Sequence, residues 1–255
     1  MKVMTINQFL QNPVGKGSAA GARRDVIIEN LRSRYSKLYK ECKKQFRMSV
    51  FEETNHYFFV FKIPSETFKD KLSYDVVIQL IPIGSAGKDL TLSRYAVKVF
   101  SNAPNFMFTY AYLYNQDGIL IDFLKKKLSN KALTQSPDVR NPNMSYGFEK
   151  SVYFALLFIT TNKQVTKALL KKNPSLNTKI VFNSITSAED KLEEFNKLKN
   201  MEEQKKIEEK KKKDKERIKK GLPPEGFKSV YRKRHYIHRN DIRRSTDKRR
   251  KAVKR

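Results

Sequence analysis

The chain of 255 residues carries 54 Lys and Arg against 26 Asp and Glu, a formal net charge of +28, and such a basic chain attracts polyanions such as nucleic acid or acidic proteins. Its single cysteine excludes a framework of intrachain disulfides, and its longest apolar stretch, Tyr153 to Ile159, falls far short of the roughly 20 residues needed to cross a bilayer. We therefore expect a soluble intracellular protein without a membrane partner, located in the cytoplasm, associated with a nucleoid or enclosed in a virion.

The first elements are a predicted leader and a basic helix. Residues 1–23 are expected to form a flexible leader, because Asn12 to Gly21 is rich in glycine and small residues. Apolar residues then recur at helical spacing from Asp25 to Phe46, and we interpret Cys42 on this apolar side as a small buried hydrophobe. The other faces would form a secondary basic ridge, made of Arg24, Arg32, Arg34, Lys37, Lys40 and Lys44. The ridge either contacts phosphates without reading bases or is simply the charged outer face of a helix.

An antiparallel sheet of four to five strands is predicted next. Its strands are rich in β-branched and aromatic residues and are bounded by Pro, Gly, Asn or Ser. They are Asn55 to Ile63, Leu72 to Ile83, Leu90 to Ser101 and Phe106 to Asn115. Met48 to Glu53 would add a short edge strand, and the short spacers favour an antiparallel meander. The alternating Tyr110, Tyr112 and Tyr114 are expected to pack on a helix, with a stacking platform for bases as the alternative.

Helical patterns return after this sheet. Ile119 to Leu128 has one apolar face, and Tyr146 to Thr160 is apolar nearly all round, which is typical of a buried helix. Gln164 to Lys172 would be a short basic helix, and Lys179 to Phe182 a last strand. The order of helix, sheet and two or three packing helices predicts an α+β globular domain over residues 24–183.

Residues 184–221 are predicted to form an extended, solvated helix that acts as a spacer. Ser187 with the acidic Glu189 and Asp190 in the first turn after it is typical of a helix N-terminus. From Glu202 to Lys220 the sequence is nearly all Glu and Lys and lacks the heptads of a coiled coil. Gly221, followed by two prolines within three residues, is expected to end the helix sharply.

Residues 222–255 are predicted to be a basic irregular arm that binds nucleic acid. After Leu222 there are thirteen Lys and Arg against three acidic residues, so the segment is too polar to fold alone. Arginine can bridge phosphates with two hydrogen bonds, and tyrosine can stack on bases. The candidate binding residues are Lys228, Tyr231, Arg232, Lys233, Arg234, Tyr236, Arg239, Arg243, Arg244, Lys248, Arg249, Arg250 and Lys251.

A rival interpretation assigns catalysis to the arm. His235 and His238 lie close together, and histidine serves as a general base or a metal ligand in nucleases. A divalent cation would meet repulsion in this arginine-rich segment, and a metal site needs ligands held by a second shell of contacts. We therefore predict no catalytic residue, no metal and no cofactor, and keep a metal-dependent nuclease as the alternative.

The preferred hypothesis is a non-enzymatic structural or assembly protein. Its α+β domain would serve assembly within a larger complex, and its arm would hold DNA, RNA or an acidic protein surface. The bias toward Lys, Asn, Ile, Phe and Tyr is common in AT-rich genomes, and with the long charged arms it favours a component of a phage, a virion or a nucleoprotein complex. A factor associated with RNA or the ribosome is a further alternative.

Overall fold

The computed structural model describes residues 3–11, 24–41, 46–53, 56–84, 92–139, 149–162 and 178–222. The chain divides into two compact units, Met1–Asn196 and Lys197–Arg255. The first unit is an α+β fold, as the sequence predicts. It extends past residue 183, the expected end of the globular domain, and includes the first turns of the long charged helix α9, Ala188–Lys219.

Four strands form an antiparallel meander in the order β1-β2-β3-β4, which confirms the predicted sheet. The strands are β1 Arg47–Glu53, β2 His56–Pro64, β3 Ser73–Pro82 and β4 Tyr95–Ser101. The predicted short edge strand is β1. In β4 the apolar Tyr95, Val97 and Val99 are buried while Ala96 and Lys98 between them are half-buried, so the alternation in the sequence reflects the pleat of the strand.

Two segments from distant parts of the sequence cover the outer edge of β4. Thr5 forms an antiparallel bridge with Ala96, and Leu120 forms a parallel bridge with Val99. The Val97 amide donates to the Met4 carbonyl at 2.8 Å, and the Val99 amide donates to the Ile119 carbonyl, also at 2.8 Å. Backbone groups that would otherwise lie open at a sheet edge are paired in this way.

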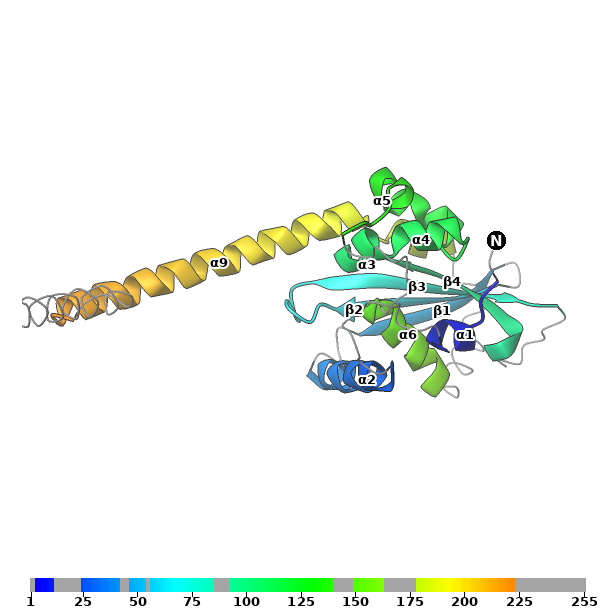
Figure 1. Ribbon diagram of the computed structural model, residues 1–255, viewed down its shortest axis with the longest axis horizontal. Coiled ribbons are helices and arrows are strands. Elements are labelled where there is room, and N and C mark those ends of the chain that lie inside the picture. The colour runs from blue at the N-terminus through cyan, green and yellow to red at the C-terminus, as the bar shows by residue number, and fades with distance from the viewer. Residues whose placement is uncertain are drawn as a thin grey trace, which may run out of the picture. The chain divides into compact units, whose positions relative to one another are not determined.

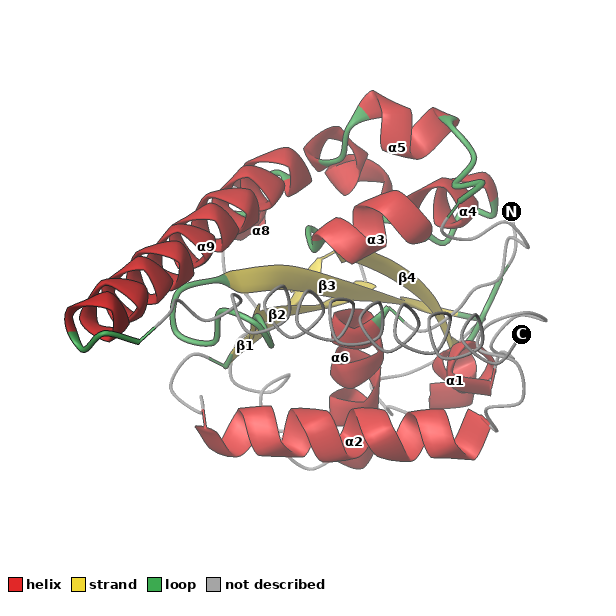
Figure 2. Ribbon diagram, turned by 60° about the vertical axis from the view of Figure 1, so that its left-hand side comes forward, coloured by secondary structure: helices red, strands yellow, loops and turns green. Residues whose placement is uncertain are grey.

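Helices pack on both faces of the sheet, with α2 and α6 on one face and α3 and α4 on the other (Figure 1, Figure 2). The α-helices of this unit, besides the start of α9, are α1 Ile6–Gln11, α2 Arg24–Glu41, α3 Pro104–Thr109, α4 Ala111–Gln116, α5 Asn130–Thr134, α6 Lys150–Thr161 and α8 Thr178–Asn183. Two 3-10 helices, η1 Leu92–Arg94 and η2 Asp122–Lys127, complete the described elements. In the described part of the chain, no helix combines the length and the apolar character needed to span a membrane.

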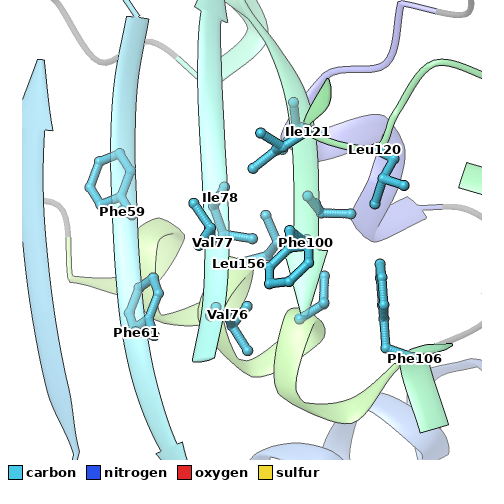
Figure 3. Close-up of a cluster of buried hydrophobic side chains, with 14 of the residues drawn as sticks. Phe59, Phe61, Val76, Val77, Ile78, Phe100, Phe106, Leu120, Ile121 and Leu156 are labelled. Carbon is cyan, nitrogen blue, oxygen red and sulfur yellow. The ribbon is translucent and has the colours of Figure 1, made fainter. Parts of the chain in front are cut away.

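The core lies on both sides of the central strand β3. Val76, Val77 and Ile78 are fully buried although consecutive residues point to opposite faces (Figure 3). On one face, Phe61 contacts Phe158 of α6 edge to face, with ring centroids 5.9 Å apart. Full burial of each such side chain stabilises the fold by about 1.5–3 kcal/mol. Two covering layers therefore explain why β3 is a nearly continuous apolar run instead of an alternating one.

The predicted strand over Phe106 to Asn115 is wrong, because this segment forms α3 and α4. Its aromatic residues repeat every second position, but Phe106, Tyr110 and Tyr114 also repeat every fourth position, which is helical spacing. The Tyr110 amide donates to the Phe106 carbonyl, and the Tyr114 amide donates to the Tyr110 carbonyl, both at 3.0 Å. Tyr114 is fully buried, and its ring stacks on that of Tyr110. The three tyrosines do not form an open stacking platform, because they lie on helices and not on one strand face.

Three further expectations about elements are corrected. Lys179 to Phe182 lies in the helix α8 and is not a strand. Ile119 to Leu128 is not one amphipathic helix, because its first residues bridge to β4 and η2 follows. The helix expected up to Phe46 is α2, Arg24–Glu41, and Phe46 is not helical but directly precedes β1.

The N-terminal segment is part of the core in the described range 3–11. Met4, Ile6 and Phe9 are buried, so these positions do not belong to a flexible leader. The Tyr153 hydroxyl of α6 donates to the Leu10 carbonyl at 3.2 Å. Apolar anchors at Ile6 and Phe9, three residues apart, explain why this short stretch docks as a helical turn.

The charged helix α9 confirms the prediction of a solvated helix. At its N-terminus, the Asp190 amide donates to the Ser187 hydroxyl at 3.1 Å, which is the predicted cap. At its C-terminus, Gly221 has φ +68°, and the Leu222 amide donates to the Arg217 carbonyl at 2.9 Å. This hydrogen bond across a glycine with positive φ is typical of a Schellman motif. From Met201 onward the apolar residues of the helix are exposed, with Met201 at 51%, Ile207 at 46% and Ile218 at 59%.

Several predicted features lie outside the described residues. They are Cys42, residues 12–23 of the expected leader, the expected helix Gln164 to Lys172 and everything after Leu222.

Candidate functional site

The predicted nucleic-acid-binding residues, from Lys228 to Lys251, all belong to the segment after Leu222 and lie outside the described residues. The same is true of His235 and His238, on which the alternative of a nuclease depends. Both predictions therefore stay predictions.

The secondary basic ridge on α2 can be followed in part. The side chains of Arg34, Lys37 and Lys40 are exposed, as a basic ridge requires. Arg34 is ion-paired, with its Nη2 at 2.5 Å from Oε2 of Glu66. The structure does not describe the side chains of Arg24 and Arg32, and Lys44 lies outside the described residues. In the described part of the ridge, Lys37 and Lys40 therefore have no described ion pair, whereas Arg34 is neutralised by Glu66.

A cleft of about 490 Å³ lies in the first unit. Side chains of α2, β3, α3, α6 and the first turns of α9 line it, together with the turn that follows β2. Its polar lining consists of Tyr35, Ser65, Glu66, Thr67, Tyr74, Asn105, Glu149, Lys150, Ser151 and Asn196. Apolar contacts come from Phe108, Leu192 and Phe195. A cleft with an apolar wall and several converging polar groups is the usual form of a ligand site.

Glu149 is the most buried charged group of this cleft, with only 3% of its surface exposed. It caps α6, because its Oε2 accepts a hydrogen bond from the Val152 amide at 2.7 Å. Burial raises the pKa of the Glu149 carboxyl, and hydrogen bonds from Val152 and Ser151 offset this only in part. The helix N-terminus and these donors thus hold a carboxylate in a site that otherwise disfavours its charge.

The other carboxylate of the cleft, Glu66, lies between two cations. Its Oε2 is 2.5 Å from Nη2 of Arg34 and 3.2 Å from Nζ of Lys150. Because Glu66 and both cations are partly exposed, this network contributes modestly to stability. It nevertheless fixes α2 and α6 to the turn after β2, and so it shapes the wall of the cleft.

Two phenols complete the polar lining. Burial raises the pKa of Tyr35, whose hydroxyl is also hydrogen-bonded to Ser151. Burial likewise raises the pKa of Tyr74, which is hydrogen-bonded to Ser65. Both phenols are therefore protonated at neutral pH and can donate hydrogen bonds, but they cannot act as phenolate nucleophiles. The cleft as described suits binding through hydrogen bonds and apolar contact.

Two aspartates elsewhere in the first unit are each held by their own polar partners. Asp75 is buried, its Oδ2 accepts from Asn102 Nδ2 at 3.0 Å, and burial raises its pKa. Asp122 pairs with Lys98 at 2.5 Å and with Lys125 at 2.8 Å. Although burial acts to raise it, these hydrogen bonds hold the pKa of Asp122 below its usual value. Among the described residues, no group of three His, Cys, Asp or Glu side chains could hold a metal ion.

Comparisons with protein-family models, with curated proteins and with solved structures give no match.

Sequence reasoning missed the cleft. Tyr35, Tyr74 and Glu149 come from three distant elements, and no motif in the sequence connects them. The one local signal is Glu149 directly before the apolar run of α6, which fits an N-cap position. Glutamate is not among the residues preferred at an N-cap, so this signal is weak.

Proposed function

We propose that this protein is a non-enzymatic nucleic-acid-binding protein that holds its ligand through the basic segment after Leu222. The uneven distribution of charge carries the proposal. The helix α9 has twelve Lys and Arg against ten acidic residues, whereas the segment after Leu222 has thirteen against three. The residues after Leu222 therefore carry +10 of the net charge of +28 in only 33 residues, the highest density of positive charge in the chain, whereas α9 adds only +2.

The chemistry of the segment favours phosphate over a general acidic surface. Eight of its thirteen cations are arginines, which bind phosphate through two parallel hydrogen bonds. Tyr231 and Tyr236 are interleaved with them and supply rings on which bases stack. Neutralising about ten phosphates would make the affinity fall by several orders of magnitude between low and moderate salt.

The test measures binding of the full chain to a DNA duplex and to a single-stranded RNA over a series of salt concentrations. Eight cations of the segment are replaced together by Ala: Arg232, Lys233, Arg234, Arg239, Arg243, Arg244, Arg249 and Arg250. We expect most of the affinity to be lost and the slope of log K against log salt to become shallower by about seven, since each released counterion contributes about 0.9.

A matched control removes eight cations from α9 instead. Its substitutions to Ala are at Lys205, Lys206, Lys210, Lys211, Lys212, Lys213, Lys215 and Lys219. The two variants have the same net charge, and Ala favours a helix. A slope that is unchanged in the first variant, or equally reduced in both, would contradict the proposal.

The alternatives are outcomes of related measurements. Metal-dependent cutting of the same duplex, lost in His235→Ala/His238→Ala, would favour a nuclease. Tight binding to polyglutamate with weak binding to both nucleic acids would favour an acidic protein partner. A large preference for RNA at fixed salt would favour an RNA- or ribosome-associated factor.

A further inference from the structure

The two edges of the sheet differ in whether other segments pair with them. Met4 to Thr5 and Ile119 to Ile121 pair with β4, but no strand in the described ranges pairs with the outer edge of β1. β1 has seven residues, all of them in register with β2. An edge of this length presents a row of amide and carbonyl groups that can accept another strand.

The charges of β1 are arranged so that the strand complements itself. Arg47 is at one end, Glu53 at the other, and both are exposed. When β1 is placed antiparallel to a second β1 with Val50 opposite Val50, Arg47 lies opposite Glu53 at both ends. Met48 then lies opposite Glu52. A two-fold axis through Val50 generates all seven pairs, so both copies use the same surface.

Other registers lose this match. A shift by one residue would bring side chains of opposite faces against each other. A shift by two places Arg47 opposite Phe51 or beyond the partner's strand, and both charge pairs disappear. Within the monomer, Arg47 lies opposite Lys62 of β2, a like-charge neighbour that a carboxylate on the other side would offset. No ion pair of Arg47 or Glu53 is found within the described part of the chain.

We propose that the outer edge of β1 is a dimerisation surface, on which a second copy of this chain adds its own β1 in the antiparallel register that pairs Arg47 with Glu53. The sheet then continues from one copy into the other. This proposal concerns the described unit only and goes beyond nucleic-acid binding, because the two activities use different residues.

The test uses the full chain, freed of nucleic acid, in sedimentation equilibrium at about 150 mM salt, where charges further apart than about 8 Å are largely screened. We expect a reversible dimer for the wild type. Arg47→Glu and Glu53→Arg each place like charges opposite each other at both ends, and each should raise the dimer Kd by about tenfold or more. Lys126→Glu and Glu29→Arg make the same charge changes at exposed sites away from β1 and should leave the dimer Kd unchanged.

Two combinations make the test specific for the register. A mixture of the Arg47→Glu and Glu53→Arg chains restores both opposite-charge pairs, so it should form a mixed dimer tighter than either chain forms alone. The double variant R47E/E53R should dimerise like the wild type. A wild type that stays monomeric up to about 100 µM, a concentration well above the Kd of specific interfaces, overturns the proposal. So does a mixture that dimerises no better than its components. An edge that serves a strand of another protein would give the first of these results.

Discussion

Glu149 has two opposing effects on stability, because burial disfavours its charge while its carboxylate caps α6. Its carboxylate is buried, which raises its pKa, and it also satisfies the Val152 amide at the start of α6. The cap places Glu149 beside Tyr35 and Ser151 at the base of the cleft. Removing the charge while keeping the acceptor separates these two effects.

Glu149→Gln should flatten the dependence of stability on pH. The folded-state pKa of Glu149 is above the usual value of 4.5, so its stabilising contribution is fully present below that value and is lost as the pH rises through the folded-state pKa. The glutamine does not titrate but keeps an oxygen that accepts from Val152. The measurement is the free energy of unfolding in urea at several pH values between 4 and 7, which we expect to fall less in the variant than in the wild type.

Asp122→Asn serves as the opposite control. The pKa of Asp122 is lowered by Lys125 and Lys98, so its contribution is present above the usual pKa and is lost as the pH falls. Its replacement should reduce the stability at pH 7 relative to pH 4.

Identical pH profiles for wild type and Glu149→Gln would show that the buried carboxylate does not titrate with folding.

At the scale of elements, the long helix α9 ends where its backbone needs a left-handed residue. Gly221 has φ +68°, and no atom beyond its chain neighbours lies within 4 Å of the place that a Cβ would occupy. The cost of a side chain here is therefore conformational and not steric. Gly221→Ala should weaken the last turn by about 1 kcal/mol, while Gly221→Asn should weaken it less because asparagine tolerates this conformation.

Hydrogen exchange of the Gly221 and Leu222 amides measures this change. These amides donate to the Ile218 and Arg217 carbonyls, and about 1 kcal/mol corresponds to roughly fivefold faster exchange. Amides of β3 in the other unit should exchange unchanged. Equal exchange rates in the alanine variant and the wild type would mean that the Schellman motif does not hold the end of α9.

The elements also show which parts of the fold the sequence could predict. β2, β3 and β4 were predictable because β-branched and aromatic runs are bounded by turn residues, and α9 because its caps are encoded locally. The segment Phe106 to Asn115 was not, because its aromatics satisfy both the strand and the helix period. Pairing of Thr5 with Ala96, and the meeting of Tyr35, Tyr74 and Glu149 in one cleft, depend on tertiary packing that no local pattern contains.

At the scale of the whole molecule, the buried side chains of the described segments all lie between Met4 and Ala188. A deletion of residues 223–255 should therefore leave the thermal midpoint of the first unit within about 2 °C of the full chain, since removal of surface segments rarely changes stability by more than about 0.5 kcal/mol. The measurement is circular dichroism during heating. A midpoint lowered by 5 °C or more would mean that the final segment packs on the core.

The docking of the segment around Thr5 has a consequence during protein synthesis. Thr5 is paired with Ala96, and the Leu10 carbonyl accepts a hydrogen bond from the hydroxyl of Tyr153, which lies 143 residues later in the chain. A ribosome delivers these early residues first but supplies their partners only when most of the first unit has been made. Until α6 has emerged, Ile6 and Phe9 are exposed apolar groups on a nascent chain, which chaperones bind. The docking of this segment is thus completed only by residues that are made long after it.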